Sequence, residues 1–505
     1  MIGRGVMRPA LALGAGALLA SAYQPVDMPA MSVPAVAVFA ATAWSSTWRG
    51  GALVGAAFGV GFLGPLLWWL WSSIGPGAWL ALVLVQTGWF VVLGSGIAMV
   101  RSLPLRAWWT AVLWTAVEVL RSAWPLGGLP WGRLGFSALD TVWQGWLQWG
   151  GVSVTTFVLA LVGTTAGRVF TSRAPLAMRL GTASLVVAAS MAPAAAAAST
   201  QLQNDGSASV AVVQGGVPGA GTRLVENHRE VTENHVRETV SLLAGREASG
   251  QPAPDFVLWP ENATAVDPTA DEQANNALRR AARAAGAPLL AGSITNGPDA
   301  DRARNQGIVW SSDGVPGERY TKRHLVPFGE YVPWRRFATV FSERLEDIPR
   351  DMVPGIVGEP LNVAGIPVAD ALCFDIAYDD VVGPQVRRGA TLVVVQTSNA
   401  MFLGTSQLEQ QWDISRVRAI ESGRSVVVAS VNGISGAIAP DGRVIARLAS
   451  KETGSAVVDV PLNRAMTLAV QIGPWPGRAA VALALVGLTG VAVRRLRAAV
   501  YDRSS

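Results

Sequence analysis

Three side chains in the polar middle of the chain are suited to nucleophilic chemistry. Cys373 is the only cysteine and ends an apolar run in ADALCFDIAYDD. Glu261 follows an apolar run and a proline in VLWPENAT, and Lys322 is one of two lysines in a chain that otherwise uses arginine. A thiol usually needs a base before it attacks, and a carboxylate can serve as that base. A lysine where arginine would supply the same charge suggests that a compact ammonium is required.

Each of these residues also has an ordinary structural interpretation. A lone cysteine is usually a small buried hydrophobe, and a single cysteine excludes an intramolecular disulfide. Glu261 could cap a helix or a turn. Lys451, in a predicted surface turn, shows that a lysine can occur without a role. The place of Cys373, where a strand gives way to a turn and a helix start, favours an exposed thiol with thiolate character.

The three histidines are the alternative bases. His228 and His235 lie seven residues apart on one predicted helix, where a solvated face is the simplest interpretation, and His324 stands in TKRHLVPFGEY. None of them is a strong candidate by itself. The supply of histidine and cysteine is also too small for a typical zinc site, so we expect no metal and no cofactor.

The elements that must position these residues form an alternating pattern from about residue 200. Continuous apolar strands that alternate with polar helical stretches predict a sheet covered by helices. The expected strands are 209–214, 255–259, 288–294, 306–311, 369–374, 391–396 and 425–431, and the expected helices are 222–244, 273–285, 379–388 and 407–422.

The two ends of the chain are too apolar for a soluble protein. Half of all residues are hydrophobic and 15% are charged, whereas about 25% are charged in soluble domains. Apolar stretches close to the ~20 residues that a spanning helix needs predict seven spans before the polar domain and one after it. The expected spans are 7–23, 28–47, 52–74, 77–100, 107–127, 150–170, 179–198 and 479–497.

The distribution of charge orients these spans. The formal charge is +7 over residues 1–199, −6 over 200–477 and +4 over 478–505. The arginines gather at alternate connections, which is the positive-inside pattern of membrane proteins. This pattern predicts cytoplasmic termini and a polar domain outside the cytoplasm, and a first span that served as a signal peptide would not change it. The acidic polar domain argues against nucleic-acid binding.

Three fragments together resemble the Glu–Lys–Cys triad of the nitrilase superfamily. They are WPEN at 259–262, YTKRHLVPFGEYVP at 320–333 and ALCFD at 371–375. Their order agrees with that superfamily, as do the spacings of 61 residues from Glu261 to Lys322 and 51 residues from Lys322 to Cys373.

The layout of spans narrows the resemblance to the apolipoprotein N-acyltransferase family. Seven spans before a nitrilase-like domain and one after it are typical of that family. The segment WTAVEVLRSAWPLGGLPWGRLGF (114–136) is similar to a membrane motif of the family. The matching positions are Glu118, Arg121, Gly128, Pro130, Trp131 and Gly135.

The resemblance implies a fold and a division into domains. The fold is a polytopic α-helical membrane protein of about eight spans with an inserted α/β nitrilase-like domain, built as an α-β-β-α sandwich. Residues 1–199 form the N-terminal transmembrane bundle. Residues 200–470 form the extracytoplasmic catalytic domain, and 471–505 form the last transmembrane helix and a cytoplasmic tail.

The resemblance also implies a reaction at a bacterial cell membrane. Glu261 would take the proton of Cys373, and the thiolate would attack an ester carbonyl of a phospholipid while Lys322 stabilises the oxyanion. The resulting thioester would pass its acyl chain to the α-amine of the N-terminal diacylglyceryl-cysteine of an apolipoprotein. The implied partners are therefore a phospholipid donor, a diacylated apolipoprotein acceptor and the lipid bilayer.

Further residues are implied to support this site, and some depart from the family pattern. Glu330 matches a second glutamate, whose ordinary interpretation is a loop acid that caps a turn. Phe374 and Asp375 stand where better-known members carry Tyr and Glu. Asn399 lies in SNAMFLG (398–404), which lacks the Asp and Trp of the family segment. These departures leave the three triad positions intact.

Several alternatives stay open on the sequence alone. The domain could be a membrane-anchored amidase or hydrolase that passes the acyl group to water, or an inactive nitrilase-like binding module. The apolar and aromatic segment 327–354 could be a lid at the bilayer surface or an ordinary packed loop. Glu118 and Arg121, three residues apart on one helix, could form a structural salt bridge or a functional pair within the membrane.

Overall fold

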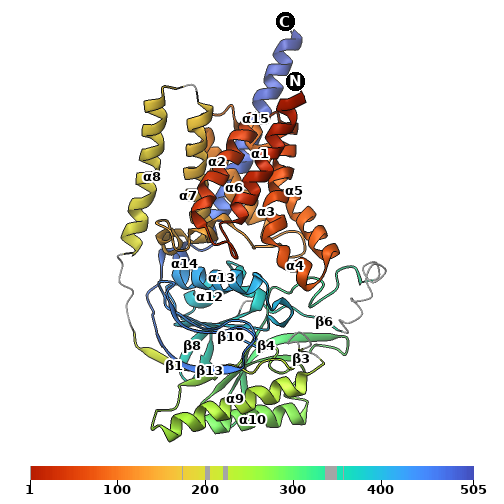
Figure 1. The fold of residues 1–505 in the computed structure, drawn as a ribbon, viewed down its shortest axis with the longest axis vertical. Helices are drawn as coiled ribbons and strands as arrows, with labels where there is room; N and C mark the ends of the chain where they lie inside the picture. Colours follow the sequence, from red (N-terminus) through yellow and green to blue (C-terminus); the bar gives the residue numbers. More distant parts are fainter. Residues whose placement is uncertain are drawn as a thin grey trace. The chain divides into compact units, whose positions relative to one another are not determined.

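The computed structural model describes residues 2–172, 174–198, 205–219, 224, 226–335, 350–356 and 358–504. The chain divides into two compact units. One unit comprises residues 1–200 together with 472–505, and the other comprises residues 201–471. The first is helical and the second is built on β-sheets, as the ribbon shows (Figure 1).

The helical unit contains long apolar helices in the part of the chain that the structure describes. Four are long and apolar enough to cross a membrane, over Trp48–Leu66, Pro76–Val100, Gly145–Val169 and Trp475–Arg495, and three shorter apolar helices cover Val6–Ala20, Pro29–Trp44 and Leu176–Met191. The helices are α1 (Ile2–Ala20), α2 (Ser32–Trp44), α3 (Trp48–Leu66), α4 (Trp68–Ser73), α5 (Pro76–Val100), α6 (Arg106–Arg121), α7 (Gly145–Thr171), α8 (Leu176–Ala198) and α15 (Trp475–Ser504), with 3-10 turns η1 (Pro29–Met31) and η2 (Leu134–Ala138).

Two of the expected spans differ in the structure. The span expected over 52–74 is broken at Leu67, whose φ of −98° and ψ of 15° separate α3 from α4. Pro65 lies just before this break and cannot donate a backbone hydrogen bond to the preceding turn. The span expected over 107–127 is the 16-residue helix α6, which ends at Arg121.

Glycines allow α3 and α5 to pack with their backbones close together. A Cβ atom added to Gly55 would lie 2.0 Å from the carbonyl oxygen of Phe90, and one added to Gly94 would lie 2.2 Å from the carbonyl oxygen of Gly51. Small residues at helix contacts are a general device of membrane proteins, because the lipid supplies no hydrophobic drive for helix association. The close approach of these two helices therefore requires glycine, which has no Cβ atom, at these positions.

The second unit contains two β-sheets packed face to face. Within the described residues, one sheet has the strand order β13-β1-β2-β3-β4-β5 with β6 beside β4, and the other has the order β12-β11-β10-β9-β8-β7. The strands are β1 (Ser207–Gln214), β2 (Phe256–Leu258), β3 (Leu289–Asn296), β4 (Arg302–Trp310), β5 (Pro316–Thr321), β6 (Asp351–Met352), β7 (Leu361–Val363), β8 (Ile366–Leu372), β9 (Leu392–Thr397), β10 (Val426–Ser430), β11 (Ser435–Ile438), β12 (Val444–Leu448) and β13 (Gly454–Pro461).

Helices cover the outer face of each sheet. Helices α9 (His228–Ala248) and α10 (Glu272–Ala285) pack on the first sheet, whereas α12 (Val382–Arg387) and α13 (Gln407–Ser422) pack on the second (Figure 1). A short helix α14 (Leu468–Ile472) follows β13. The layers therefore run helix, sheet, sheet, helix. Parallel pairing joins β1 to β2, β2 to β3, β8 to β9 and β9 to β10. The carboxyl ends of several strands therefore share an edge.

The sequence of α10 illustrates why these layers form. Its buried face is made of small apolar residues at helical spacing, so the helix can lie close to the first sheet. The helix begins after Asp271, whose side chain accepts a hydrogen bond from Ala274 N at 2.8 Å, and it ends at Gly286 in the left-handed conformation. The buried residues of this face are Ala274, Ala277, Leu278, Ala281, Ala282 and Ala285.

Several antiparallel strands, most of them at the sheet edges, were not among the predicted elements. They are β5, β7, β11, β12 and β13, and several of them are short or partly exposed, so they carry no continuous apolar run. The helix expected over 222–244 is α9, which begins at His228, and residues 222, 223 and 225 of that expectation lie outside the described residues.

A valine at Gly55 should test the close packing of α3 and α5. The added side chain would meet the backbone of Phe90, and overpacking of this kind destabilises by about 1–3 kcal/mol. We expect a lower thermal unfolding midpoint for Gly55→Val in detergent micelles. Gly88→Val on α5 is the matched control, because a Cβ there meets no atom of the described residues within 4 Å. Equal midpoints for the two variants would contradict the packing argument.

Candidate active site

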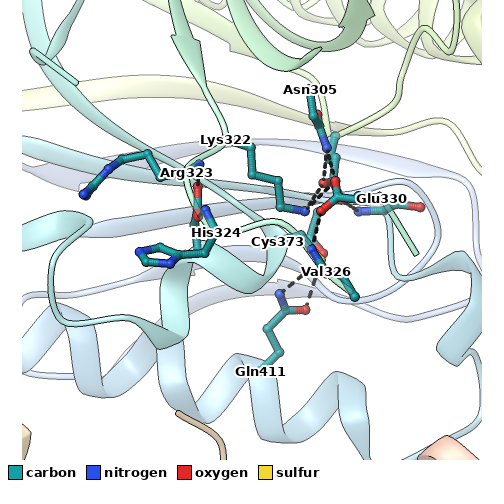
Figure 2. A network of polar contacts seen from close by, with 12 residues as sticks. Asn305, Lys322, Arg323, His324, Val326, Glu330, Cys373 and Gln411 are labelled. Atoms are coloured by element: carbon teal, nitrogen blue, oxygen red, sulfur yellow. Dashed lines mark hydrogen bonds and ion pairs between the residues drawn. The ribbon is translucent and has the colours of Figure 1, made fainter. Parts of the chain in front are cut away.

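The residues singled out in the sequence follow the ends of strands. Glu261 lies shortly after β2, Lys322 directly follows β5, and Cys373 directly follows β8. The carboxyl ends of strands in α/β sheets are where ligands usually bind, because side chains from several strands meet there. Figure 2 shows Lys322, Glu330 and Cys373 together with Asn305, and electrostatic interactions join Cys373 to Glu261, Lys322 and Glu330.

A buried ammonium lies between two buried carboxylates. Lys322 Nζ is 2.9 Å from Oε1 of Glu261 and 3.1 Å from Oε1 of Glu330. Asn305 on β4 donates its side-chain amide to the same two oxygens, at 2.7 Å and 2.9 Å respectively. Each of these carboxylate oxygens therefore receives two hydrogen bonds, and the three charged side chains are held in one arrangement.

Backbone amides hold the second oxygen of each carboxylate. Ser398 N donates to Oε2 of Glu261 at 3.0 Å, and Val326 N donates to Oε2 of Glu330 at 2.9 Å. Ser398 directly follows β9, so Glu261 is tied to the other sheet as well as to Lys322. Oε2 of Glu261 has this single hydrogen bond among the described residues, whereas Oε1 has two, which leaves Oε2 the better placed to accept a proton.

The charges of the cluster support one another. Burial alone would lower the pKa of the Lys322 ammonium, but the adjacent carboxylates of Glu261 and Glu330 outweigh it, and its pKa lies well above its usual value. Burial raises the pKa of the Glu330 carboxyl despite the nearby ammonium. Lys322 is therefore charged in the folded protein, and a buried charge of this kind is stable only while its partners remain.

Cys373 has a strained backbone and a neutral thiol. Its φ of 52° lies in the left-handed region, which costs a non-glycine residue about 1–3 kcal/mol. Burial, followed by the charge of Glu261, raises the pKa of the thiol to about 12. The sequence suggested thiolate character from a helix N-terminus, and that suggestion was wrong. The residue begins only a short 3-10 turn, η4 (Cys373–Ala377).

The side chain of Asp375 joins the cysteine turn to the segment that follows β5. Its Oδ2 accepts a hydrogen bond from Tyr320 OH at 2.8 Å, and its Oδ1 accepts one from His324 N at 2.8 Å. Phe374 packs edge-on against Tyr378, with ring centroids 5.1 Å apart. Asp375 thus fixes the path of the chain on both sides of Lys322, and Phe374 packs locally.

Asn399 lies one residue beyond the amide that binds Glu261. It has a φ of 54°, and its side chain lies against Gly433. Its buried Oδ1 has no hydrogen-bond partner among the residues that the structure describes. Among the described residues, its side chain makes no hydrogen bond to Glu261, Lys322 or Cys373, so the structure leaves it beside the site rather than within the network.

Two buried side chains of α13 belong to the site although sequence analysis did not single them out. Gln411 Nε2 lies 3.8 Å from Sγ of Cys373. Arg418 donates to the carbonyl oxygens of Ile376 at 2.9 Å and Ala377 at 2.7 Å, which holds the turn after Cys373. The sequence did contain a signal for Gln411 and Arg418, because polar residues recur at helical spacing and so form a stripe on one face of this helix. The stripe consists of Gln411, Ser415, Arg418 and Ser422.

Asn305 and Tyr320 were missed for a different reason. Both lie within strands, on β4 and β5, and act only through contacts across the sheet. Tyrosine is common in strands, and Asn305 lies in no motif that marks a site, so neither residue was singled out. Within the described residues, no group of three or more His, Cys, Asp or Glu side chains is arranged to hold a metal ion.

The membrane motif forms a separate cluster within the helical unit. Glu118 accepts hydrogen bonds from Trp114 Nε1 at 3.0 Å, Leu134 N at 2.8 Å and Thr156 Oγ1 at 2.9 Å. Its side chain is buried and is bonded to three groups from α6, the following loop and α7.

Arg121 is bonded to the same loop through other atoms. It donates to the carbonyl oxygens of Leu129 at 2.9 Å and Trp131 at 2.8 Å, and Pro130 between them is buried. The i,i+3 salt bridge, which was one of the two interpretations of Glu118 and Arg121, does not occur in the described part of the chain. Both side chains fold the loop that carries Pro130 and Trp131 instead.

The expected lid over 327–354 is only partly described. Residues 336–349 of it lie outside the described residues. Of the described part, Phe328 is 46% exposed and Trp334 is 70% exposed. Large exposed aromatics of this kind occur at surfaces that contact a partner or a lipid.

Comparisons with known proteins cover both units. Residues 15–165 match the family described as apolipoprotein N-acyltransferase N-terminal domain, and residues 209–469 match the carbon-nitrogen hydrolase family. An apolipoprotein N-acyltransferase from Mycolicibacterium smegmatis is 33% identical over 504 residues, which cover 95% of this chain and 84% of the relative.

Two further proteins are similar over a large part of their length. An apolipoprotein N-acyltransferase from Pseudomonas putida is 28% identical over 487 residues, which cover 92% of this chain and 93% of the relative. A solved amidase of the nitrilase superfamily from Nesterenkonia covers 54% of this chain and 96% of its own, with a TM-score of 0.38 and 19% identity.

Alkylation of Cys373 should report the electrostatics of the site. Because the charge of Glu261 raises the pKa of the thiol, Glu261→Gln should lower it and expose more thiolate. We expect iodoacetamide to label the variant on the order of tenfold faster than the wild type at mildly alkaline pH, as measured by intact mass. Glu359→Gln removes an exposed carboxylate and is the control. Slower labelling of Glu261→Gln would contradict this account.

Proposed function

The chain belongs to the apolipoprotein N-acyltransferase family, and from this premise we propose that it acylates apolipoproteins through a thioester on Cys373. The acyl donor is a phospholipid, and the acceptor is the α-amine of the N-terminal diacylglyceryl-cysteine. The observation that carries the proposal is the charged cluster of Glu261, Lys322 and Glu330 beside the neutral thiol. It supplies a base, an oxyanion donor and a nucleophile in one place.

The first step transfers the acyl chain to the enzyme. Oε2 of Glu261 takes the proton of the Cys373 thiol as Sγ forms a bond to the ester carbonyl carbon of the phospholipid. The oxyanion that develops is stabilised by the ammonium of Lys322, and one such donor is typically worth about 10²–10³ in rate. The intermediate then expels the lysophospholipid alkoxide, which receives the proton from Glu261, and a thioester remains.

The second step transfers the acyl chain to the acceptor. The lipoprotein amine attacks the thioester carbonyl, and Glu261 takes a proton from the nitrogen. The C–S bond breaks, the amide is released, and the proton returns to the sulfur of Cys373. This two-step covalent course is ping-pong catalysis, and the same base serves both halves.

The supporting residues act by holding this geometry. Glu330 balances the charge of Lys322 and supplies a second hydrogen-bond acceptor for the ammonium beside Glu261. Asp375 ties the cysteine turn to the segment after Lys322. Phe374 and Asn399, which pack beside the site, are assigned to the shape of the acyl and acceptor pockets.

We extend the proposal to the membrane. Acyl chains keep both substrates in the bilayer, since each buried CH₂ is worth about 0.8 kcal/mol. The chain would cross a bacterial plasma membrane about eight times through residues 1–199 and 471–505. The catalytic domain over 200–470 would lie outside the cytoplasm and both termini inside. The apolar helices and the arginine-rich connections support this arrangement.

Two features would contact lipid. In the helical unit, Glu118 and Arg121 fold the loop with Pro130 and Trp131, and we assign this loop to lipid binding. The segment 327–354 would act as a lid, which the exposed Phe328 and Trp334 support.

An acyl-transfer assay should test the reaction. We expect phosphatidylethanolamine to leave an acyl adduct on Cys373 in intact-mass spectra of the purified chain, and a diacylated lipopeptide to remove the adduct as it becomes triacylated. Cys373→Ala should form no adduct. Release of free fatty acid without any transfer would indicate a hydrolase, and a wild-type chain that forms no adduct would indicate a binding module. Either result would refute the proposal.

The two lysines of the chain offer a matched pair of variants. Lys322→Gln should lower kcat/KM by about 10²–10³, because the oxyanion loses its cationic donor. Lys451→Gln alters the other lysine, which is exposed, and should keep wild-type turnover of the lipopeptide. Equal activity of the two variants would exclude Lys322 from the chemistry.

A further inference from the structure

Two fully buried polar side chains lie between the sheets behind the site. Asp370 on β8 and Gln396 on β9 have no exposed surface. In the pairing of these parallel strands, Gln396 is opposite Leu372, two residues beyond Asp370. Among the described residues, neither carboxyl oxygen of Asp370 nor the side-chain Oε1 of Gln396 has a hydrogen-bond partner of good geometry, although the backbone N–H of Ala371 lies close enough to the Asp370 carboxyl to act against its raised pKa. A buried oxygen without a partner is costly, and three of them together require an explanation.

Oxygen atoms of the Asp370 and Gln396 side chains lie close together beside Gly307 on β4. A Cβ atom added to Gly307 would lie 2.0 Å from Oδ2 of Asp370 and 2.5 Å from Oε1 of Gln396. The sum of these distances is the most that can separate the two oxygens, so they are near neighbours. Two acceptors this close repel each other unless a hydrogen lies between them.

The hydrogen cannot come from Gln396. Its Nε2 already donates to the carbonyl oxygen of Trp259 at 2.6 Å, and an amide flip would place Oε1 against that carbonyl. The backbone of Asp370 is also held, because its N–H donates to Gln385 and its carbonyl accepts from Gln385. The carboxyl group of Asp370 is therefore the remaining source of the hydrogen between the two oxygens.

The surroundings of Asp370 favour its neutral form. The titratable groups that interact with it are the carboxyls of Asp375 and Glu261 and the phenol of Tyr320. The two carboxyls disfavour a further negative charge. Burial, followed by these neighbours, raises the pKa of the Asp370 carboxyl well above its usual range.

We propose that Asp370 is a neutral carboxylic acid in the folded protein, that its hydroxyl donates to Oε1 of Gln396, and that this link positions Glu261. The chain of hydrogen bonds would run from Asp370 through Gln396 to Trp259, two residues before Glu261. Gln396 also lies two residues before Ser398, whose N–H binds Glu261. The positioning role rests on the proposed function, whereas the neutral acid does not.

Asp370→Asn tests the neutral acid without reference to activity. An unfolded aspartate titrates near pH ~4. A group whose pKa is raised on folding therefore loses stabilising free energy as pH rises from that value toward the folded pKa. The asparagine amide donates to Gln396 at every pH. We expect the unfolding midpoint of Asp370→Asn, in detergent micelles, to exceed that of the wild type by an amount that grows from acidic to neutral pH.

Asp459→Asn is the control for this comparison. It removes an exposed carboxylate on β13, and its unfolding midpoint should follow that of the wild type across the same pH range. The infrared spectrum of the wild type should contain a neutral carboxylic acid band that Asp370→Asn lacks. A midpoint of Asp370→Asn below the wild type at neutral pH, or the absence of that band, would show an ionised Asp370 and overturn the proposal.

The kinetics of two variants test the positioning role. Asp370→Leu leaves Gln396 without its donor, and a displaced base should lower kcat about a hundredfold with little change in KM. Asp370→Asn should restore wild-type kcat and the wild-type pH profile. Wild-type kcat in a folded Asp370→Leu, or an inactive Asp370→Asn, would remove the positioning role. Failure of acyl transfer in the wild type would instead refute the proposed function and leave the unfolding comparison valid.

Discussion

The buried ammonium of Lys322 is the interaction on which the rest of the site depends. A single charge in this interior would be strongly disfavoured, and so would either carboxylate without the ammonium. Because Glu261 follows β2 and Lys322 follows β5, their attraction also fixes the ends of separate strands against one another. Glu330 and Asn305 complete the set, so that removal of Lys322 would leave two buried carboxylates without their cation.

The same charges restrain the nucleophile. Glu261 is the base that we propose for Cys373, yet its negative charge, together with burial, raises the pKa of the thiol and so favours the protonated sulfur. Oxidants attack the thiolate rather than the thiol. In the proposed orientation Cys373 lies outside the cytoplasm, where no reducing pool protects it, and it would gain resistance to oxidation from the carboxylate that we propose as its base.

Much of this organisation could be predicted from residue type and position, and the remainder depends on tertiary contacts. Lys322 and Cys373 stand out because each residue type is rare in this chain, and Cys373 also follows an apolar run. Asn305 acts only because β4 lies beside the cluster, and Arg418 binds a carbonyl 41 residues away, which no local pattern reveals. In the helical unit, hydropathy predicted one continuous span over 52–74, whereas the helix is broken at Leu67. Hydropathy does not reveal this break, because the residues around it are as apolar as those of the helices.

The pairing of β1 with β13 has a consequence for how the protein is made. The first strand of the second unit finds its neighbour in the last strand, with Ser207 opposite Pro461. Contacts so distant along the chain form late, because the intervening segment must close first. A ribosome that has released β1 must therefore deliver almost the whole domain before that edge is covered. Until then the apolar strand stays open to chaperones and to misassembly.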